Sequence, residues 1–510
     1  MKEISFQCSP RQAKDDDFIS SKIKSLLNLN IEDKIYFEWH KRSVDARKKN
    51  VKINCRFLVS TEHPIEKKSI TEFKAPQTNK CVHIIGMGPA GMFAALYALK
   101  CGFKPIIYER GKNVRDRRRD LAKLNKEGIV NAESNYCFGE GGAGTYSDGK
   151  LYTRSKKRGD VREILNLLVQ FGANKDILVD AHPHIGTNKL PQIISLINEE
   201  IISCGGEIHF NSKLTDLNIS EGIIKDIIIN DQITLPISNL ILATGHSARD
   251  IYHLLDAKGI RLTAKSFALG VRVEHTQDFI DQAQYGQLND EFLPPATYKL
   301  ATQVNEKGVY SFCMCPGGII APCATGNNEV VTNGWSPSKR NNPYSNSGIV
   351  VSVNPEDIDH SGSPFTCLNF QKKIEQKAWE LAGKNQKVPA QCLLDFIQNK
   401  KSTEFPRSSY QPGIKSIKMD DLFPSFICDR LRKGFIEFDK KIPGFITNDA
   451  VLHAPESRTS SPILIPRDKE KYHHIDILNL YPCAEGAGYA GGIVSAAIDG
   501  MNCMLNISKL

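Results

Sequence analysis

Residues Val82 to Glu109 constrain the fold of this chain more than any other stretch. They read VHIIGMGPAGMFAALYALKCGFKPIIYE, in which an apolar run leads into Gly86, Gly88 and Gly91, a helix-forming segment follows, and a second apolar run ends at Glu109. This is the G-x-G-x-x-G pattern of a dinucleotide-binding fold, in the strand, turn and helix setting that the pattern requires. The segment therefore predicts a Rossmann-like unit that binds an adenine dinucleotide.

The glycines and the acidic residue of this segment have separate expected roles. Gly86 permits the tight turn, Gly88 lets the backbone approach a pyrophosphate, and Gly91 lets the helix pack closely against the strand. The free N–H groups and the positive dipole end of that helix face the phosphates. Glu109 stands 18 residues after Gly91, at the expected tip of the second strand, where its carboxylate accepts hydrogen bonds from a ribose diol.

Further glycine-rich segments suggest more cofactor contacts. Five glycines between Gly139 and Gly149 would break a helix or strand, but they expose N–H groups to a flat ring or a phosphate; a flexible loop is the alternative. A buried strand ends in Ala243-Thr244-Gly245, where backbone can lie beside a cofactor. Near the C-terminus, Glu485 precedes a glycine-rich helix start, which would place a carboxylate near sugar hydroxyls and a helix N-terminus near an electron-rich ring.

The chain is long enough for several domains, because 510 residues exceed one ordinary core. We expect an α/β protein that begins with a small basic α/β domain in residues 1–75. Residues 80–265 would form the first part of the Rossmann-like domain, and 446–510 would return to it. Residues 266–445 show strand-like segments broken by Gly and Pro, which predict a substrate domain with a mostly antiparallel sheet and a helical insertion.

Charge is concentrated at the start of the chain. Residues 1–80 hold 17 Lys and Arg against 11 Asp and Glu, so they carry most of the formal charge of +9. We expect the basic run Lys41 to Lys49 to be a surface loop, with a contact to an acidic partner as the alternative. No RNA-binding motif accompanies the charge, which argues against a nucleic-acid partner.

No apolar run approaches the roughly eighteen residues that cross a bilayer, and no signal-peptide block is present, so we expect a cytoplasmic protein without a membrane partner.

The 14 cysteines are scattered from Cys8 to Cys503, without a C-x-x-C or the spacing of a zinc site. We therefore expect reduced, apolar core residues and no metal site. Cys313 and Cys315 form the one close pair in the sequence. We interpret them as two core thiols on alternate positions of one strand rather than as a redox couple.

Taken together, these segments resemble the glutathione-reductase-like class of flavoproteins with two dinucleotide domains. Within that class the chain is similar to the family of FAD-dependent, or NAD(FAD)-utilising, dehydrogenases. The resemblance covers nearly the whole chain and is carried by Lys41–Lys48, the Gly86 fingerprint, Phe138–Leu151, Ala243–Asp250, Gly270–His275, Glu456–Asp468 and Ala484–Ile493. It implies FAD as the cofactor and an FAD-binding domain that is discontinuous and closed by the C-terminal segment.

The resemblance also implies which residues contact FAD. Glu485 stands where such flavoproteins usually carry an aspartate, and the N–H groups of Gly491, Gly492 and Ile493 would face the pyrimidine edge of the flavin, where negative charge develops on reduction. The full implied set is Gly86, Gly88, Ala90, Gly91, Glu109, Arg110, Gly141, Gly142, Gly144, Thr145, Leu214, Ala243, Thr244, Gly245, Glu485, Gly486, Gly491, Gly492 and Ile493.

The function expected from this pattern is that of an FAD-dependent oxidoreductase, which transfers a hydride between the flavin and an unidentified, anionic small molecule. Arg272, His275 and Arg458 are the candidate catalytic residues. An arginine fork suits a carboxylate or phosphate, and a histidine can move a proton near neutral pH. The alternative for the first two is structural, in that Arg272 pairs with an acidic neighbour and His275, at or just beyond the strand end, caps the sheet.

Two other functions remain open from the sequence. A simple NAD-dependent dehydrogenase explains the fingerprint but leaves the later glycine-rich segments without a purpose. A flavin-carrying binding protein for RNA or an acidic protein would use the basic first domain. Because no second fingerprint is visible, we expect any NADH or NADPH donor to bind transiently in the substrate cleft. The oligomeric state is open.

Overall fold

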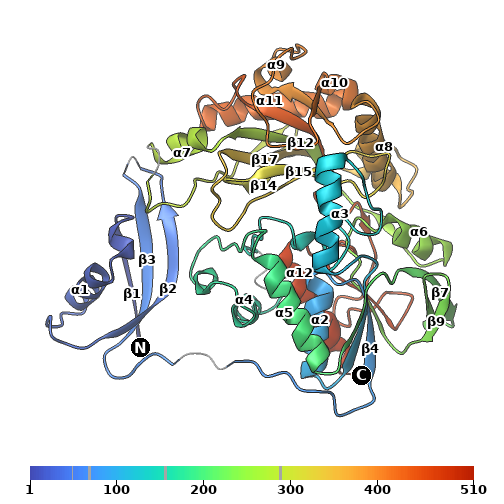
Figure 1. Cartoon of the computed structure of the whole chain (residues 1–510), viewed down its shortest axis with the longest axis horizontal. Helices are drawn as coiled ribbons and strands as arrows, with labels where there is room; N and C mark the ends of the chain where they lie inside the picture. Colours follow the sequence, from blue (N-terminus) through green and yellow to red (C-terminus); the bar gives the residue numbers. More distant parts are fainter. Residues whose placement is uncertain (49, 67–69, 154–157, 287–289, 510) are drawn as a thin grey trace.

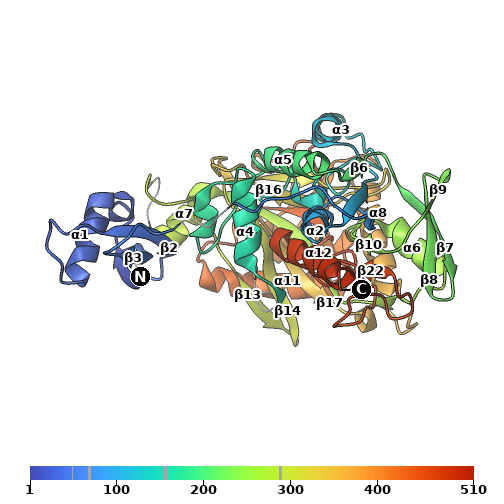
Figure 2. The same cartoon turned by 90° about the horizontal axis from the view of Figure 1, so that it is seen from below.

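The computed structural model describes residues 1–48, 50–66, 70–153, 158–286 and 290–509 of the chain. Three larger sheets organise these residues. The N-terminal sheet stands to one side, and a seven-stranded sheet lies above a five-stranded parallel sheet and its helices in the view of Figure 1. The view from below shows the same separation of the N-terminal sheet (Figure 2).

The N-terminal sheet is antiparallel in the order β1-β3-β2, and one helix packs on it. Ile19 and Ile23 of the helix are fully buried against Phe57 of the central strand, which fixes the helix by its apolar side. Asp15 caps the helix by accepting the N–H of Phe18. The elements are β1 (Lys2–Cys8), α1 (Asp16–Leu26), β2 (Tyr36–Asp45) and β3 (Lys52–Ser60).

The basic run that we expected to be a loop is partly a strand, so this expectation was wrong. Its first residues pair with β3, from Lys41 opposite Arg56 to Asp45 opposite Lys52, whereas Lys49 lies outside the described residues. The pairing supplies backbone hydrogen bonds that a local charge pattern does not reveal. Arg42 also connects this sheet to the rest of the chain, because its guanidinium lies 2.8 Å from Asp180 and its N–H donates to the carbonyl of Val179.

The second sheet is parallel, in the order β22-β10-β4-β5-β6. Strand alternation gives it two apolar faces, since Ile84 packs with the helices on one side and Ile85 with the small antiparallel ladder on the other. The strands are β4 (Cys81–Ile85), β5 (Lys104–Tyr108), β6 (Glu207–His209), β10 (Leu240–Leu242) and β22 (Leu480–Pro482). Strand β22 comes from the C-terminal segment, so residues far apart in sequence complete one sheet.

Helices cover one face of the parallel sheet and a three-stranded ladder covers the other. The C-terminal helix packs directly on the fingerprint helix, where a Cβ on Gly500 would lie 2.1 Å from the carbonyl oxygen of Ala90. The helices of this region are α2 (Pro89–Lys100), α3 (Val114–Glu127), α4 (Val161–Gln170), α5 (Leu190–Ser203), α6 (Arg249–Ala257) and α12 (Ile493–Ile507). The ladder consists of β7 (Leu214–Ser220), β8 (Ile223–Ile229) and β9 (Ile233–Pro236).

The third sheet has the order β13-β14-β17-β12-β20-β18-β19 and is antiparallel except for the pair β18 and β19. Its strands are β12 (Phe267–Thr276), β13 (Ala301–Val304), β14 (Lys307–Cys315), β17 (Tyr344–Val353), β18 (Val388–Cys392), β19 (Ile414–Ser416) and β20 (Val451–Glu456). The helices α7 (Gln277–Tyr285), α8 (Thr366–Leu381), α9 (Leu393–Ile397), α10 (Met419–Leu422) and α11 (Ser425–Lys441) pack with it. Two short ladders pair β11 (Thr263–Ala264) with β21 (Ile463–Leu464) and β15 (Ile319–Pro322) with β16 (Thr332–Trp335).

The architecture is thus a mixed α/β fold with a parallel sheet, as the sequence predicted. Among the described residues, no helix is long and apolar enough to cross a membrane.

Candidate cofactor site

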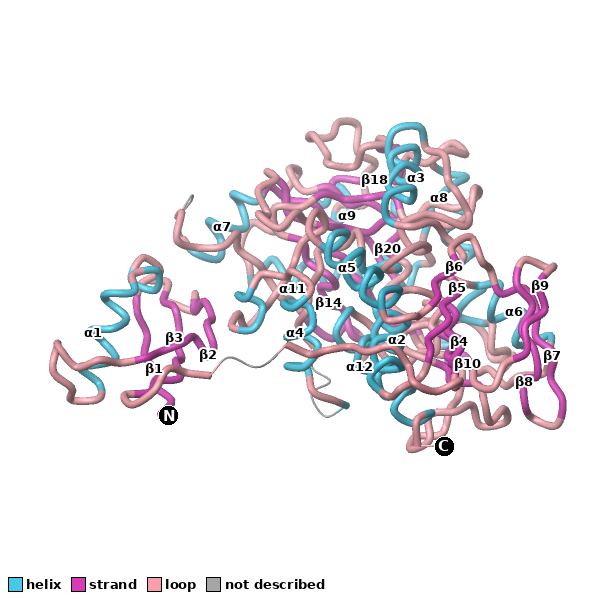
Figure 3. Tube along the Cα trace, turned by 60° about the horizontal axis from the view of Figure 1, so that its bottom comes forward, coloured by secondary structure: helices cyan, strands magenta, loops and turns pink. Residues whose placement is uncertain are grey.

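One cavity lies between the parallel sheet and the seven-stranded sheet, and both contribute to its walls. Ile85, Tyr108 and Ala243 line it from the ends of the parallel strands, and Cys313 and Glu456 line it from the second region. Strands β4, β5 and β10 run side by side (Figure 3), and β4 is central, with β10 on one side and β5 on the other. The cavity therefore lies at the carboxyl ends of the parallel strands where the strand order reverses, which is the usual ligand position in such sheets.

The fingerprint turn has no room for side chains. Gly86 has a φ of +97°, and a Cβ there would lie 2.5 Å from the carbonyl oxygen of Ala243 in the neighbouring turn. A Cβ on Gly91 would lie 2.0 Å from the carbonyl oxygen of Gly86. Helix α2 begins at Pro89, directly after Gly88, so its unpaired N–H groups lie at the cavity wall. The turn thus offers backbone donors to an anionic group, as a pyrophosphate requires.

Glu109 lines the cavity and also ties three turns together. Its Oε2 accepts the N–H of Met87 at 2.9 Å, and its Oε1 accepts the N–H groups of Gly111 at 2.8 Å and Gly139 at 2.9 Å. An ionised carboxylate offers about four acceptor positions, so one position at Oε2 is left for a further donor. The geometry allows a ribose hydroxyl at this position, but most of the carboxylate serves the protein backbone.

Arg117 holds the glycine-rich loop, a role that our sequence analysis missed. Its side chain is fully buried, and its guanidinium donates hydrogen bonds at 2.7–3.2 Å to six acceptors. These are the carbonyl oxygens of Asn135, Tyr136, Gly139, Glu140 and Gly142 and the Oγ1 of Thr145. Burial lowers the pKa of Arg117, and the six acceptors replace the lost water. The loop is therefore a fixed structure rather than the flexible loop that we kept as an alternative.

Arg458 lines the cavity from a buried cluster of four charged residues. Its Nη2 lies 2.6 Å from Glu329 and 3.1 Å from Glu375, and Arg249 lies 3.1 Å and 2.7 Å from the same two carboxylates. Burial opposes ionisation of Glu329, yet the two arginines hold the pKa of that carboxyl well below its usual range. Glu329 is therefore ionised near pH 7, and Arg458 is the member of the cluster that faces the cavity.

His246 also lines the cavity, and our sequence analysis did not select it. Burial, reinforced by repulsion from Arg458 and Arg249, lowers the pKa of His246 to about 3. Its ring is therefore neutral near pH 7. Among the described residues, no group hydrogen-bonds to its buried Nδ1. The available signal was its position directly after Gly245, at the end of a buried strand.

Arg272 and His275 are not among the described residues that line the cavity. Arg272 is fully buried, and Glu456 accepts its Nη2 at 2.7 Å and its Nε at 2.8 Å. His275 contacts the carbonyl oxygen of Phe445 at 2.9 Å, and burial lowers the pKa of this histidine to about 4. It lies one position before the end of β12 at Thr276, in agreement with the expected position at the strand end.

The C-terminal segment contributes Glu485, Gly492 and Ile493 to the cavity wall. Helix α12 begins at Ile493, so its N-terminal N–H groups lie at this wall. Burial raises the pKa of Glu485 to about 7, with Lys265 opposing the rise. An acidic side chain and a positive helix end are thus brought together beside the fingerprint turn.

Most residues expected around FAD lie on the cavity wall. The wall residues are Gly86, Gly88, Ala90, Glu109, Arg110, Gly142, Gly144, Leu214, Ala243, Thr244, Gly245, Glu485, Gly492 and Ile493. The other five expected residues do not line the cavity; they are Gly91, which packs on Gly86, Gly486, which packs on Gly245, Gly491, which packs on Glu485, and Gly141 and Thr145, which contact each other within the glycine-rich loop.

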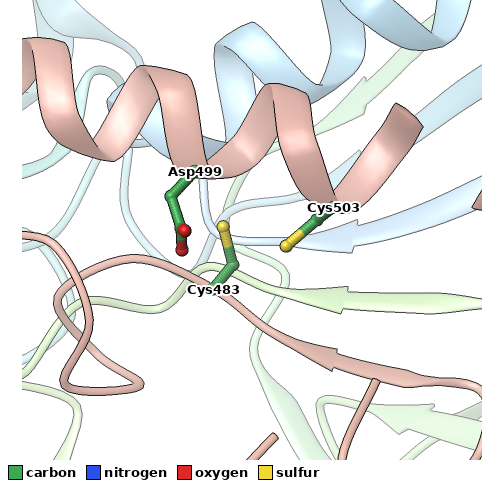
Figure 4. Close-up of side chains that lie close together, drawn as sticks. All are labelled: Cys483, Asp499 and Cys503. Carbon is green, nitrogen blue, oxygen red and sulfur yellow. The ribbon is translucent and has the colours of Figure 1, made fainter. Parts of the chain in front are cut away.

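Cys483, Asp499 and Cys503 lie close together in the C-terminal segment (Figure 4). The carboxylate of Asp499 accepts two hydrogen bonds from Arg467, at 2.6 Å and 2.9 Å, and one from the N–H of Ala484 at 2.7 Å. The guanidinium thus already supplies the positive charge that faces Asp499. We interpret the cluster as an anchor of α12 to β22 rather than a metal site.

Comparisons with known proteins identify the cofactor. Residues 266–459 match the family described as FAD-dependent protein, C-terminal domain-like, and residues 1–60 match a domain of unknown function. FAD is therefore the cofactor of this flavoprotein, and the alternative of an NAD-dependent dehydrogenase without a flavin is set aside.

Solved structures show only weak overall similarity. CtdE in complex with FAD is 11% identical with a TM-score of 0.33, and each chain covers 84% of the other. The quinol fumarate reductase FrdA of E. coli is 10% identical with a TM-score of 0.38, over 85% of this chain and 70% of that chain. Both TM-scores are too low to support a conclusion about this chain.

A relative covers almost the full length. An uncharacterized protein of Clostridium beijerinckii (strain ATCC 51743 / NCIMB 8052) is 39% identical over 516 aligned positions, which include 96% of this chain and 95% of the relative. The chain therefore belongs to the same protein family as this Clostridium beijerinckii protein, and it carries the C-terminal-like domain of an FAD-dependent protein.

Proposed function

We propose that this protein is an FAD-dependent oxidoreductase that transfers a hydride between the flavin and an anionic small molecule. We further propose that it belongs with the NAD(FAD)-utilising dehydrogenases of the glutathione-reductase-like class. The observation that carries the proposal is the composition of one cavity, which the dinucleotide fingerprint lines from one side and Arg458 of the second region lines from the other.

The residues of the cavity fit FAD. The crowded turn at Gly86 brings backbone N–H groups to the wall, and Glu109 keeps one acceptor position for a ribose hydroxyl. The start of α12 at Gly492 and Ile493 would face the electron-rich part of the flavin, where a positive helix end stabilises added charge. FAD supplies the hydride chemistry when it is bound, and the protein orients the cofactor and the substrate.

The substrate side of the proposal rests on Arg458 and His246. Arg458 would orient a carboxylate or phosphate, although Glu329 and Glu375 already share its charge. His246 stays neutral near pH 7, so its ring would be a neutral hydrogen-bond partner for the substrate beside the cationic Arg458. In this proposal His246 takes the place in the cavity that we had expected of His275. Any NADH or NADPH donor would occupy the same cavity transiently.

Arg458 can be tested with a matched control in the same charge cluster. Arg458→Lys keeps the charge but loses the planar fork, so it should retain FAD and slow flavin reduction by anionic compounds at least tenfold. Arg249→Lys changes the same cluster at a residue that is not on the described cavity wall, and it should leave the reduction rate near that of the wild type. Each variant is mixed anaerobically with panels of anionic and neutral compounds, and the loss of flavin absorbance measures the rate of flavin reduction. Equal rates for the two variants with every compound would contradict the assignment.

A further inference from the structure

A second cavity lies between helices α3 and α5, on the other side of the glycine-rich loop from the FAD cavity. Its volume is about 810 Å³, which is within the usual range of roughly 300–1,000 Å³ for small-molecule sites. Neighbouring residues of one segment point to opposite sides, since Tyr136 and Tyr146 line the second cavity whereas Cys137 and Ser147 line the FAD cavity. Among the described residues, none lines both cavities, so the loop and the residues before it form a wall between them.

Three aromatic side chains line the second cavity, and they are Tyr136, Tyr146 and Trp335. The two tyrosine rings meet edge to face, with centroids 6.3 Å apart. Both hydroxyl groups are held in place, because that of Tyr136 accepts the amide of Asn125 at 2.8 Å and that of Tyr146 donates to the carbonyl oxygen of Val114 at 3.0 Å. Trp335 stands at the end of β16 and packs against the same apolar cluster as Tyr146. The rings therefore offer a fixed apolar surface to a planar ligand.

Two arginines of α3 line the same cavity without an ion pair. Arg115 and Arg118 are three positions apart, so they lie next to each other on one side of the helix. In the part of the chain that the structure describes, no carboxylate forms an ion pair with either guanidinium, whereas the adjacent Arg119 pairs with Asp116 at 3.0 Å. Two guanidinium groups in this arrangement suit a carboxylate or a phosphate.

Two carboxylates also line the cavity, but neither pairs with these arginines. Glu140 is buried, and its oxygens accept the N–H of Val114 at 2.6 Å and the amide of Asn198 at 2.8 Å. Its charge thus lies at the N-terminus of α3, where the helix dipole stabilises it. Glu199 of α5 is exposed to solvent. The charge of the two arginines is therefore available to a ligand.

We propose that the second cavity binds an anionic aromatic small molecule. Its ring packs on the aromatic side chains that line the cavity, and its carboxylate or phosphate pairs with Arg115 and Arg118. This site depends neither on the hydride reaction nor on the substrate proposed beside Arg458, because the wall of the glycine-rich loop separates the two cavities.

Calorimetric titration of the FAD-loaded protein tests the site with two pairs of probes. Naphthoate and its neutral counterpart naphthamide test a carboxylate, and AMP and its neutral counterpart adenosine test a phosphate. In at least one pair, the anion should bind at one site per chain and at least tenfold more tightly than the neutral compound. Acetate or inorganic phosphate, which lack the ring, should bind at least tenfold more weakly than that anion. Absence of binding, no preference for the anion in either pair, or equal binding of the anion without a ring would overturn the proposal.

Variants of α3 locate the bound anion. Arg115→Gln and Arg118→Gln should each raise its dissociation constant roughly tenfold. Arg119→Gln is the matched control, because it removes the same charge from the same helix outside the described cavity wall, and it should leave the constant unchanged. Flavin absorbance should show full FAD loading in all three variants. Unchanged affinity in both Arg115→Gln and Arg118→Gln, or a loss of binding in Arg458→Lys instead, would overturn the proposal, and the latter would place the anion in the FAD cavity.

Discussion

Arg117 offers the most direct test of how this fold builds its cofactor site. Arg117→Met keeps the apolar stem but removes every donor from six acceptors in and around the glycine-rich loop. A hydrogen bond to a charged group contributes about 1.5–3 kcal/mol. If only two of the six are lost without replacement, the change is about 3–6 kcal/mol, and 3 kcal/mol alone corresponds to more than a hundredfold in an equilibrium constant.

We expect this loss to divide between FAD affinity and the free energy of unfolding. The dissociation constant of FAD, measured by flavin fluorescence after dilution, should rise at least a hundredfold, and the thermal midpoint of the FAD-free protein should fall. Arg117→Lys should be intermediate, because an ammonium has three donors where the guanidinium has five. Arg118→Met is the control, since Arg118 is exposed on the same helix and should change neither quantity. Unchanged FAD affinity and midpoint in Arg117→Met would refute the reasoning and leave the loop held by other contacts.

Two further predictions concern the acidic residues of the site. Glu109→Gln should weaken FAD binding roughly tenfold to a hundredfold, because an amide NH₂ would then face the N–H of Met87; equilibrium dialysis measures this, and unchanged affinity would contradict it. Burial raises the pKa of Glu485 in the folded protein from its usual 4.5 to about 7, so the folded state holds the proton more tightly. Between about pH 4.5 and pH 7 the free energy of unfolding of the FAD-free protein should therefore fall as pH rises, by roughly 3 kcal/mol at most. Urea unfolding at pH 5 and pH 8 should show a smaller fall in the free energy of unfolding for Glu485→Gln than for the wild type. Equal falls in the two proteins would exclude Glu485 as the cause of the pH dependence.

Local sequence patterns predicted those parts of the fold that local interactions determine. The bounds of α5, Leu190 to Ser203, agree with the apolar periodicity, and the turn at Gly86 follows from its glycine spacing. Strand ends were less predictable, because a partner strand decides them. Strand β12 extends through Thr276 since Tyr344 of β17 pairs with it, and no feature near Thr276 in the sequence reports that contact.

The cofactor site was also predictable only where local sequence determines it. Backbone contacts around the fingerprint could be inferred from glycine positions, but the surroundings of buried charges could not. Arg272 meets Glu456 across 184 positions of sequence, so its burial in an ion pair is a property of the sheet order. Arg117 was visible only as part of a basic helix, because its acceptors are backbone carbonyls that carry no residue signature. Lys150 contacts the sulfurs of Cys313 and Cys315, and this contact likewise depends on a register shift in β14 that sequence alternation does not indicate.

The late position of β22 and α12 in the chain has a consequence for biosynthesis. Leu240 of β10 pairs with Leu480, which the ribosome adds 240 residues later. At roughly 5–20 residues per second, the edge of β10 lacks β22 for about 10–50 seconds, and the apolar side of α2 lacks α12 for about 20–80 seconds. A nascent chain in this interval exposes an unpaired strand edge and apolar surface, which are the features that chaperones bind and that cause aggregation. The cavity wall includes Glu456 of the seven-stranded sheet and Ile493 of α12, so it is complete only after nearly the whole chain has been synthesised. FAD therefore binds the complete cavity only at the end of synthesis or later.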